Sequence, residues 1–197
     1  MLTMKRKSKR HITDEEAFWE REREADSTRR KDITYLNYVD VPDFSRVDID
    51  SLEGLTDPDG STLLAPEIRE CYDSLDTLRN SKIVNFGGMT NTDLKLEYGA
   101  PNLPILQQYD ANYINLLSTV AKLGEYLIKA GHETEAAEIL EYGISIGTDV
   151  SKNYYLLANI YKKAGRKNEI ADLIAAARKT DSLMTPTIIR KLEELSR

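Results

Sequence analysis

Two stretches of the C-terminal third match each other at a single offset of 34 residues. Each contains a turn glycine, Gly131 in the first stretch and Gly165 in the second, with helix-forming sequence on both sides. Residues of the same size class recur in the same order around the two glycines. The matched pairs are Val120 with Tyr154, Leu123 with Leu157, Gly124 with Ala158, Leu127 with Tyr161, Ala136 with Ile170, Leu140 with Ile174 and Gly143 with Ala177. A fixed offset of this length predicts a two-helix unit that occurs twice.

This order of residues resembles the tetratricopeptide repeat, whose period is about 34 residues. In that pattern a large residue, a leucine, a small residue and an aromatic line the inner face of a first helix, and a glycine permits the turn into a second helix. The resemblance covers roughly residues 117–181, which lack the family's first Trp and its closing Pro. It implies antiparallel helix hairpins stacked as a short, right-handed, tetratricopeptide-like solenoid.

About three repeats are usually needed for independent stability, because the outer face of each terminal repeat is apolar. Two repeats alone would therefore leave apolar flanks that other elements must cover. The last stretch, "TPTIIRKLEELSR", has Thr185 as a cap and Pro186 at the first helical position, and it predicts a capping helix. Its inward-facing residues are Ile188, Ile189, Leu192 and Leu195. We therefore expect an all-α fold in which residues 110–197 hold two repeats and a C-terminal capping helix.

Residues 63–109 are expected to form the helical N-terminal part of the body and to cover the other flank. "PEIRECYDSLDTLRNSKI" predicts an amphipathic helix with Cys71 as a buried hydrophobe on its apolar face. The rest of that face is formed by Ile68, Tyr72, Leu75 and Leu78. A short helix capped by Asn91 or Thr92 should end at Gly99, and a further turn of helix should run from Leu103 to Tyr109.

Residues 13–31 predict a charged helix, because Thr13 and Glu16 have the spacing of a capping box. It is either a solvated spacer or a helix whose Phe18 and Trp19 insert into a partner or a membrane interface. Residues 32–62 are interpreted as an acidic linker laid partly across the body through Tyr35, Val39, Val41 and Phe44. The acidic residues do not have the spacing of an EF-hand calcium loop.

Residues 1–12 form a basic tail on an acidic protein. The tail carries five of the 27 basic residues and no acidic ones, which leaves 22 bases against 33 acids in the remainder. Its cations are Lys5, Arg6, Lys7, Lys9 and Arg10. Such a tail predicts a patch for an anionic membrane surface, whereas the acidic remainder argues against nucleic-acid binding. The lone cysteine and the lack of a signal sequence favour the cytoplasm, with membrane association at its cytoplasmic face.

The combination of "HITDEEAFWEREREADSTRRKDI", "TNTDLKLEYGAPNL" and the C-terminal repeats resembles an uncharacterised family of Gram-positive bacterial proteins. Its members start with a transmembrane helix, followed by basic and acidic juxtamembrane stretches and a helical body. The resemblance implies no activity. No run of about 18 apolar residues occurs in this sequence, so either this is a soluble version or the native start lies upstream.

No catalytic motif is found, and no cofactor or metal is expected. "GHETEA" has Ala136 where the zinc-protease motif needs its second histidine, so His132 is interpreted as a solvent-facing residue. Gly87-Gly88 lacks the Gly-Lys-Ser/Thr of a phosphate loop. We expect no enzyme activity. The alternative is a small enzyme or ligand-binding protein with a site near residues 87–102, where Asp93, Lys95 and Tyr98 lie.

The expected function is therefore binding of another protein or peptide, as an adaptor or scaffold. The resemblance implies that the first helix of each repeat lines a concave groove. The predicted groove residues are Lys122, Glu125 and Lys129 in the first repeat, and Lys152, Tyr155, Asn159 and Lys162 in the second. Several lysines beside one aromatic would suit an acidic segment or a carboxylate. The alternative is that these residues are merely solvated helix faces.

Overall fold

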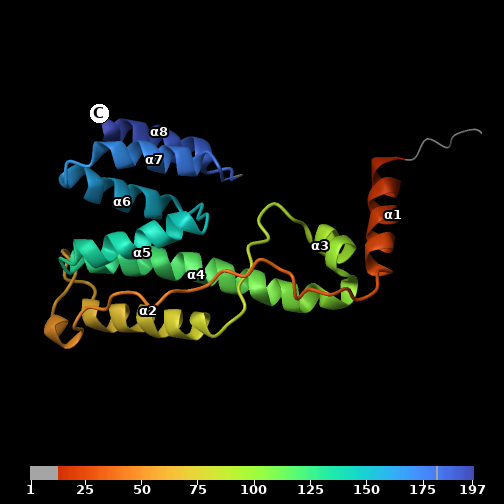
Figure 1. Ribbon diagram of the computed structural model, residues 1–197, viewed down its shortest axis with the longest axis horizontal. Helices are drawn as coiled ribbons and strands as arrows, with labels where there is room; N and C mark the ends of the chain where they lie inside the picture. The colour runs from red at the N-terminus through yellow and green to blue at the C-terminus, as the bar shows by residue number, and fades with distance from the viewer. Residues whose placement is uncertain (1–12, 181) are drawn as a thin grey trace, which may run out of the picture. The chain divides into compact units, whose positions relative to one another are not determined.

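The computed structural model describes residues 13–180 and 182–197, and this part of the chain is all-α, as predicted (Figure 1). The α-helices are α1 (Asp14–Asp26), α2 (Leu64–Arg79), α3 (Asn91–Tyr98), α4 (Leu103–Lys129), α5 (Glu133–Ser145), α6 (Ser151–Lys163), α7 (Lys167–Ala177) and α8 (Thr185–Ser196). Two short 3₁₀ helices are η1 (Asp50–Leu52) and η2 (Ala100–Asn102). The β pairing among the described residues is one isolated bridge between Thr56 and Leu63.

The chain divides into two compact units. The first unit consists of the described residues up to Leu36 together with Gly88–Gln107, and it holds α1, α3 and η2. The second unit consists of Asn37–Gly87 and the described part of Gln108–Arg197. This division differs from the sequence-based ranges, because the contacts of the first unit join residues about 70 positions apart.

In the first unit α1 packs against α3 mainly through charged and polar contacts. The guanidinium of Arg21 lies 2.5 Å from the carboxylate of Asp93, and Nζ of Lys95 lies 2.6 Å from Asp26 and 3.3 Å from Glu22. The backbone turns closely after α3, where a Cβ on Gly99 would lie 2.1 Å from the carbonyl oxygen of Arg29. The buried apolar side chains of this unit are few.

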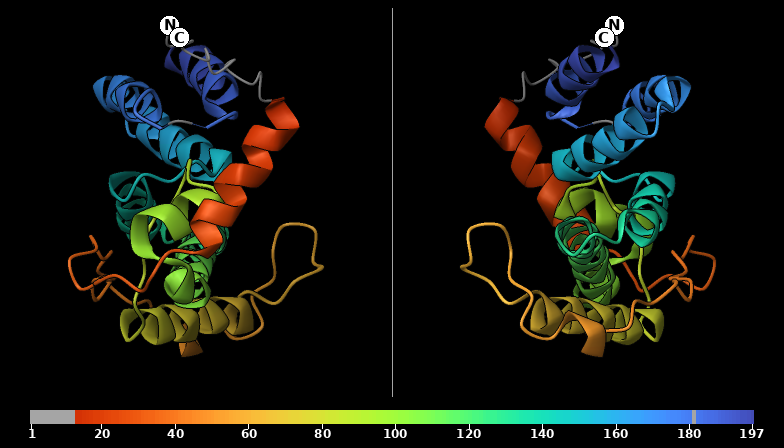
Figure 2. Two further views of the ribbon diagram at one scale, coloured as in Figure 1. Left: turned by 90° about the vertical axis from the view of Figure 1, so that its right-hand side faces the viewer. Right: turned by 90° about the vertical axis from the view of Figure 1, so that its left-hand side faces the viewer.

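The second unit has a continuous apolar core that extends from residue 41 to residue 192. The predicted apolar face of α2, including Cys71, is buried in this core, and so are the matched large residues of α4 and α6. The extended segment 37–49 crosses this unit and buries Val41, Phe44 and Val47. The expected linker is therefore partly a core element, although Tyr35 is exposed. Figure 2 shows the loop 55–63, in gold, standing out from the end of α2.

The helices around the two turn glycines pack closely. Gly131 and Gly165 both have a positive φ, in the region that favours glycine, and each lies between two helices. A Cβ on Gly124 of α4 would lie 2.6 Å from Leu140 of α5, and one on Gly143 of α5 would lie 2.9 Å from Val120 of α4. Farther along, α6 contacts α5, α7 and α8. Of the fourteen residues matched at the 34-residue offset, all are buried except Ile174, which is partly buried.

Several element bounds differ from the sequence-based expectation. The Thr13–Glu16 capping box is confirmed, but α1 ends at Asp26 rather than near Lys31. The cap of α3 is Thr90, which forms a capping box with Asp93, instead of Asn91 or Thr92. The turn expected from Leu103 and the first helix of the repeat are one helix of 27 residues, α4.

Candidate functional site

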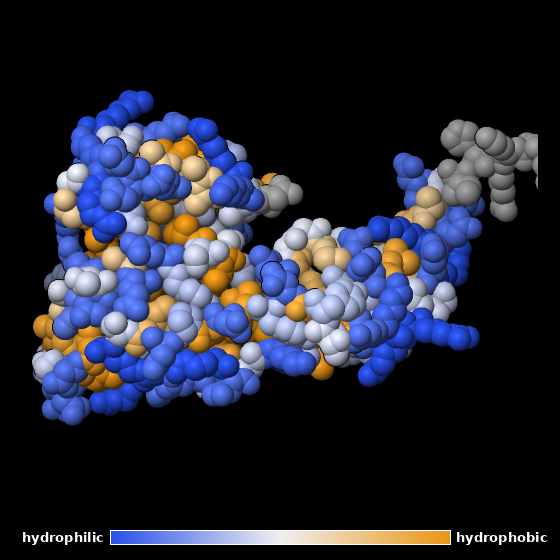
Figure 3. Space-filling view, viewed as in Figure 1, coloured by the Kyte–Doolittle hydropathy of each residue, from blue (hydrophilic) through white to orange (hydrophobic). Residues whose placement is uncertain are grey.

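The α4–α6 groove is a hollow of about 340 Å³ between the middle of α4 and the start of α6. It is lined by Ile114, Leu117, Ser118, Ala121, Lys122, Asp149, Val150 and Lys152. Ile114 is 61% exposed. Figure 3 shows hydrophobic surface where α4 passes the loop before α6. The lining therefore combines four apolar residues, which we call the apolar floor, with two lysines and one aspartate, Asp149.

The sequence places these residues through one long helix and one fixed loop. On α4 the residues Leu116, Val120 and Leu123 face the core, which turns Ser118 and Lys122 outward. The loop before α6 is held by two tyrosine hydroxyls, since Tyr113 donates to Ile146 O at 2.9 Å and Tyr154 donates to Thr148 O at 2.9 Å.

Burial raises the pKa of both tyrosines to about 12, so both remain protonated donors near neutral pH. These hydrogen bonds fix the loop that carries Asp149 and Val150 against α4, and Lys152 follows the loop in the first turn of α6. The two sides of the groove are thus joined by a hydrogen bond within the fold, from Tyr113 of α4 to the loop before α6.

A row of alternating charges continues from the groove. Glu125 lies 2.6 Å from Nζ of Lys152 and 3.1 Å from Nζ of Lys129, and Lys129 lies 3.8 Å from Asp57. Partial burial tends to raise the pKa of Glu125, but the hydrogen bonds from Lys152 and Lys129 outweigh this and lower it below its usual value. Glu125 is therefore ionised at neutral pH and neutralises part of the positive charge near the groove.

The predicted groove residues are brought together only in part. Lys122 and Lys152 line the α4–α6 groove, and Glu125 and Lys129 continue from it through the charge row. Tyr155 is partly buried, and its hydroxyl lies 3.5 Å from Thr187 O of α8. Two further predicted residues, Asn159 and Lys162, are exposed on α6 and are not among the residues that line the groove. The predicted membrane patch, Lys5, Arg6, Lys7, Lys9 and Arg10, lies outside the described residues.

The apolar floor was not predicted from the sequence. The 34-residue offset could have found part of it, because it relates Lys152 to Ser118 and Tyr155 to Ala121, and both of these line the groove. Ile114 and Val150 carry no such signal. Ile114 lies on the N-terminal side of the matched stretch, and Val150 belongs to a loop whose position depends on Tyr113 and Tyr154.

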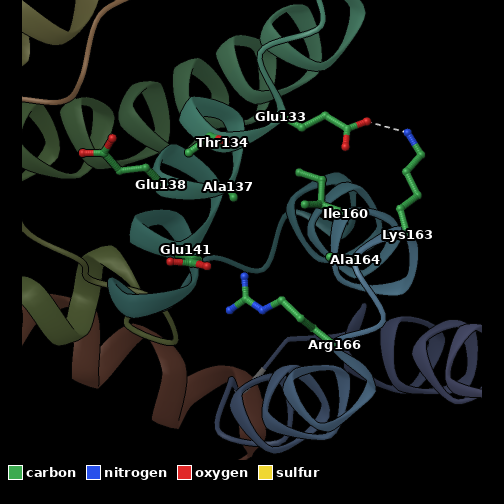
Figure 4. A pocket seen from close by; sticks show the side chains of 9 residues that line it. All are labelled: Glu133, Thr134, Ala137, Glu138, Glu141, Ile160, Lys163, Ala164 and Arg166. Atoms are coloured by element: carbon green, nitrogen blue, oxygen red, sulfur yellow. Dashed lines mark hydrogen bonds and ion pairs between the residues drawn. The ribbon is translucent and has the colours of Figure 1, made fainter.

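A second hollow, the α5–α6 cleft, has a volume of about 560 Å³ and a different character (Figure 4). It is lined by Glu133, Thr134, Ala137, Glu138, Glu141, Ile160, Lys163, Ala164 and Arg166. Its charged side chains are largely paired within the protein. Glu133 lies 2.5 Å from Lys163, and Glu141 accepts a hydrogen bond of 2.7 Å from Tyr161.

Arg166 closes one side of this cleft. Its guanidinium lies 4.4 Å from the centre of the Tyr161 ring and 3.0 Å from the carboxylate of Glu169, and Figure 4 shows it turned toward Glu141. Because these contacts satisfy the charges from inside the protein, the α5–α6 cleft is the weaker candidate for a ligand.

In the alternative site near residues 87–102, the side chains of Asp93 and Lys95 are engaged in the packing of the first unit. Hydrogen bonds from Thr90 and Arg21 lower the pKa of Asp93 to about 2, and Lys95 is paired with Asp26 and Glu22. Within residues 13–180 and 182–197, no group of three or more His, Cys, Asp or Glu side chains is arranged to hold a metal ion.

Comparisons with known protein families, with curated protein sequences and with solved structures find no match to this chain. None of the helices in the described part of the chain is long and apolar enough to cross a membrane.

Proposed function

We propose that this protein is a non-catalytic protein-interaction module that binds a segment of a partner in the α4–α6 groove. In this proposal α4 with α5 and α6 with α7 are two antiparallel hairpins of a short, right-handed, tetratricopeptide-like solenoid, and α8 is its C-terminal capping helix. The close approaches at Gly124 and Gly143 and the burial of the matched residues support this arrangement.

The observation that carries the proposal is an apolar floor between two lysines. Ile114 exposes most of its side chain to solvent, and its burial under a partner would be favourable at about 25 cal/mol per Å² of apolar surface. The lining carries two lysines, Lys122 and Lys152, against one carboxylate, Asp149, and this balance favours an acidic segment over a basic one. A partner segment with an apolar side chain next to carboxylates fits both features.

Charge reversal in the groove provides the test. We expect the double variant Lys122→Glu/Lys152→Glu to lose the partners that the native protein retains in affinity capture, while its far-UV circular dichroism is unchanged. The matched control is Lys167→Glu/Lys179→Glu, which makes the same change in net charge at exposed residues that line neither hollow. Equal retention by all three proteins would contradict the proposal.

We further propose that the basic tail holds the protein at an anionic membrane surface. The support is the sequence alone, since five cations near such a surface contribute about 1 kcal/mol each. Sedimentation with phosphatidylserine vesicles tests this part separately. The native chain should sediment at low salt, and a variant with the five tail cations changed to Gln should stay in solution. Equal sedimentation of the two would contradict it.

A further inference from the structure

A carboxylate lies next to the groove, in addition to Asp149 in its lining. Glu125 holds Lys152 at 2.6 Å, although the side chain of Lys152 is 51% exposed and could turn toward a bound segment. Lys122, at the other edge, makes no ion pair with any of the described residues. The two lysines of the groove are thus unequal, because one is occupied from within the protein and the other is not.

Glu125 is paired with a second cation, which remains when Lys152 turns away. Nζ of Lys129 lies 3.1 Å from the other carboxylate oxygen of Glu125, one helical turn away on α4. Release of Lys152 therefore does not leave Glu125 unpaired. Ion pairs at a solvated surface are weak, and the Lys152 side chain is half exposed, so the transfer of Lys152 from Glu125 to a carboxylate of the partner has a small cost.

We infer that Glu125 is an internal competitor for the groove, whose carboxylate occupies the position beside Lys152 that a carboxylate of the partner takes on binding. The inference rests on the proposed function, because it assigns the regulation of the same groove. An acidic segment must draw Lys152 away from Glu125 and must approach the charge of Glu125 itself. A neutral apolar segment binds without either of these two costs. Glu125 consequently sets how strongly the groove discriminates between acidic and neutral partners.

The test measures the affinity of two probes for the purified full chain by fluorescence anisotropy. One probe is a dye-labelled peptide of alternating Glu and Leu, and the other has Gln in place of each Glu. We expect Glu125→Gln to bind the acidic probe about 3- to 5-fold more tightly than the native protein does, and the Gln probe equally. The matched control is Glu138→Gln, which removes one negative charge outside the groove and should change neither affinity.

Combining Glu125→Gln with Lys152→Met separates competition for Lys152 from a general charge effect. In the Lys152→Met background, the gain from Glu125→Gln should largely disappear, because the competition concerns Lys152. A persistent gain would show that the charge of Glu125 acts at long range and would overturn the inference.

The outcomes distinguish this inference from the proposed function. If the native protein binds the acidic probe, if Lys122→Glu/Lys152→Glu abolishes that binding and if Glu125→Gln does not strengthen it, the inference fails and the proposed groove stands. If neither the native protein nor Glu125→Gln binds either probe, both fail. Binding of the acidic probe by Glu125→Gln alone would support both.

Discussion

The two compact units are stabilised by different forces. In the first unit, three short ion-pair contacts join α1 to α3, and the buried apolar side chains are few. In the second unit, one apolar core connects the extended segment 37–49 with α2 and with α4 to α8. Charge contacts near the surface are weakened by salt and by pH, whereas buried apolar surface is not. The second unit therefore suits a permanent binding surface better than the first.

The single tryptophan makes this comparison measurable. Trp19 lies in the first unit, where its side chain is 52% exposed and its ring contacts Phe18 edge to face at 5.2 Å. Far-UV circular dichroism, in contrast, reports mainly on the second unit, which holds most of the helical residues. The two signals should follow different transitions.

The largest expected effect is that of a cavity in the core of the second unit. Leu157 on α6 is fully buried, and Leu157→Ala should lower the free energy of unfolding by about 2–5 kcal/mol. The dichroism transition should move to a lower urea concentration, and the Trp19 fluorescence transition should move less. Asn159→Ala, at an exposed site on the same helix, should change the free energy of unfolding by less than about 0.5 kcal/mol. Equal shifts of the two transitions would show that the two units unfold as one cooperative system.

A side chain at Gly99 that clashes with the backbone should destabilise the first unit selectively. Gly99→Ala places a Cβ 2.1 Å from the carbonyl oxygen of Arg29, in addition to the strain of alanine at φ +92°. Gly60→Ala is the matched control in the second unit, since Gly60 has φ +76° and no atom lies within 4 Å of its added Cβ.

We expect Gly99→Ala to cost about 1–3 kcal/mol more than Gly60→Ala, with the first cost read from the Trp19 transition and the second from the dichroism transition. Similar costs for the two variants would show that the close turn after α3 does not hold the first unit together.

Acid should weaken the first unit before the second. The hydrogen bonds from Thr90 and the pair with Arg21 lower the pKa of Asp93 to about 2, below its unfolded value of 3.8. The stability that Asp93 contributes is thus fully present above about pH 4 and is lost as the pH falls toward 2. We expect the Trp19 signal to change in this window, and the change to be smaller in Asp93→Asn. A dichroism change that comes first would contradict the comparison.

The smallest effect on stability is expected in the groove. Lys122 is exposed on α4, and Lys122→Ala should alter the free energy of unfolding by less than about 0.5 kcal/mol. The same variant should weaken binding of the acidic probe. A loss of stability larger than that of Asn159→Ala would indicate that Lys122 supports the fold rather than a partner.

The sequence predicted well the features that depend on local periodicity. The apolar face of α2, the capping box at Thr13 and the turns at Gly131 and Gly165 each follow from residues within about one or two helical turns. The burial of the residues matched at the 34-residue offset also agrees with the pattern. The length of α4 was missed, because the sequence from Leu103 to Tyr109 was interpreted as a separate turn of helix.

Features that depend on distant residues could not be predicted. The pairing of Lys95 with Asp26 joins positions 69 apart, and many other charged residues of this chain could have formed such a pair. The burial of Val47 and Leu52 gave no periodic signal, because the segment that carries them is largely extended and irregular. The floor of the groove required the loop before α6 to be placed against α4. In each case a contact made in the folded chain, rather than a local preference, decides the result.

The central claim is that the partner binds in the α4–α6 groove of the second unit, and methyl NMR of the purified chain tests it most directly. During titration with the Glu/Leu peptide, we predict saturable shifts of the Ile114 and Val150 methyl signals, with the Ile160 signal of the α5–α6 cleft unchanged. Saturable shifts at Ile160 without shifts at Ile114 and Val150, or no saturable shift at any methyl group, would contradict the claim.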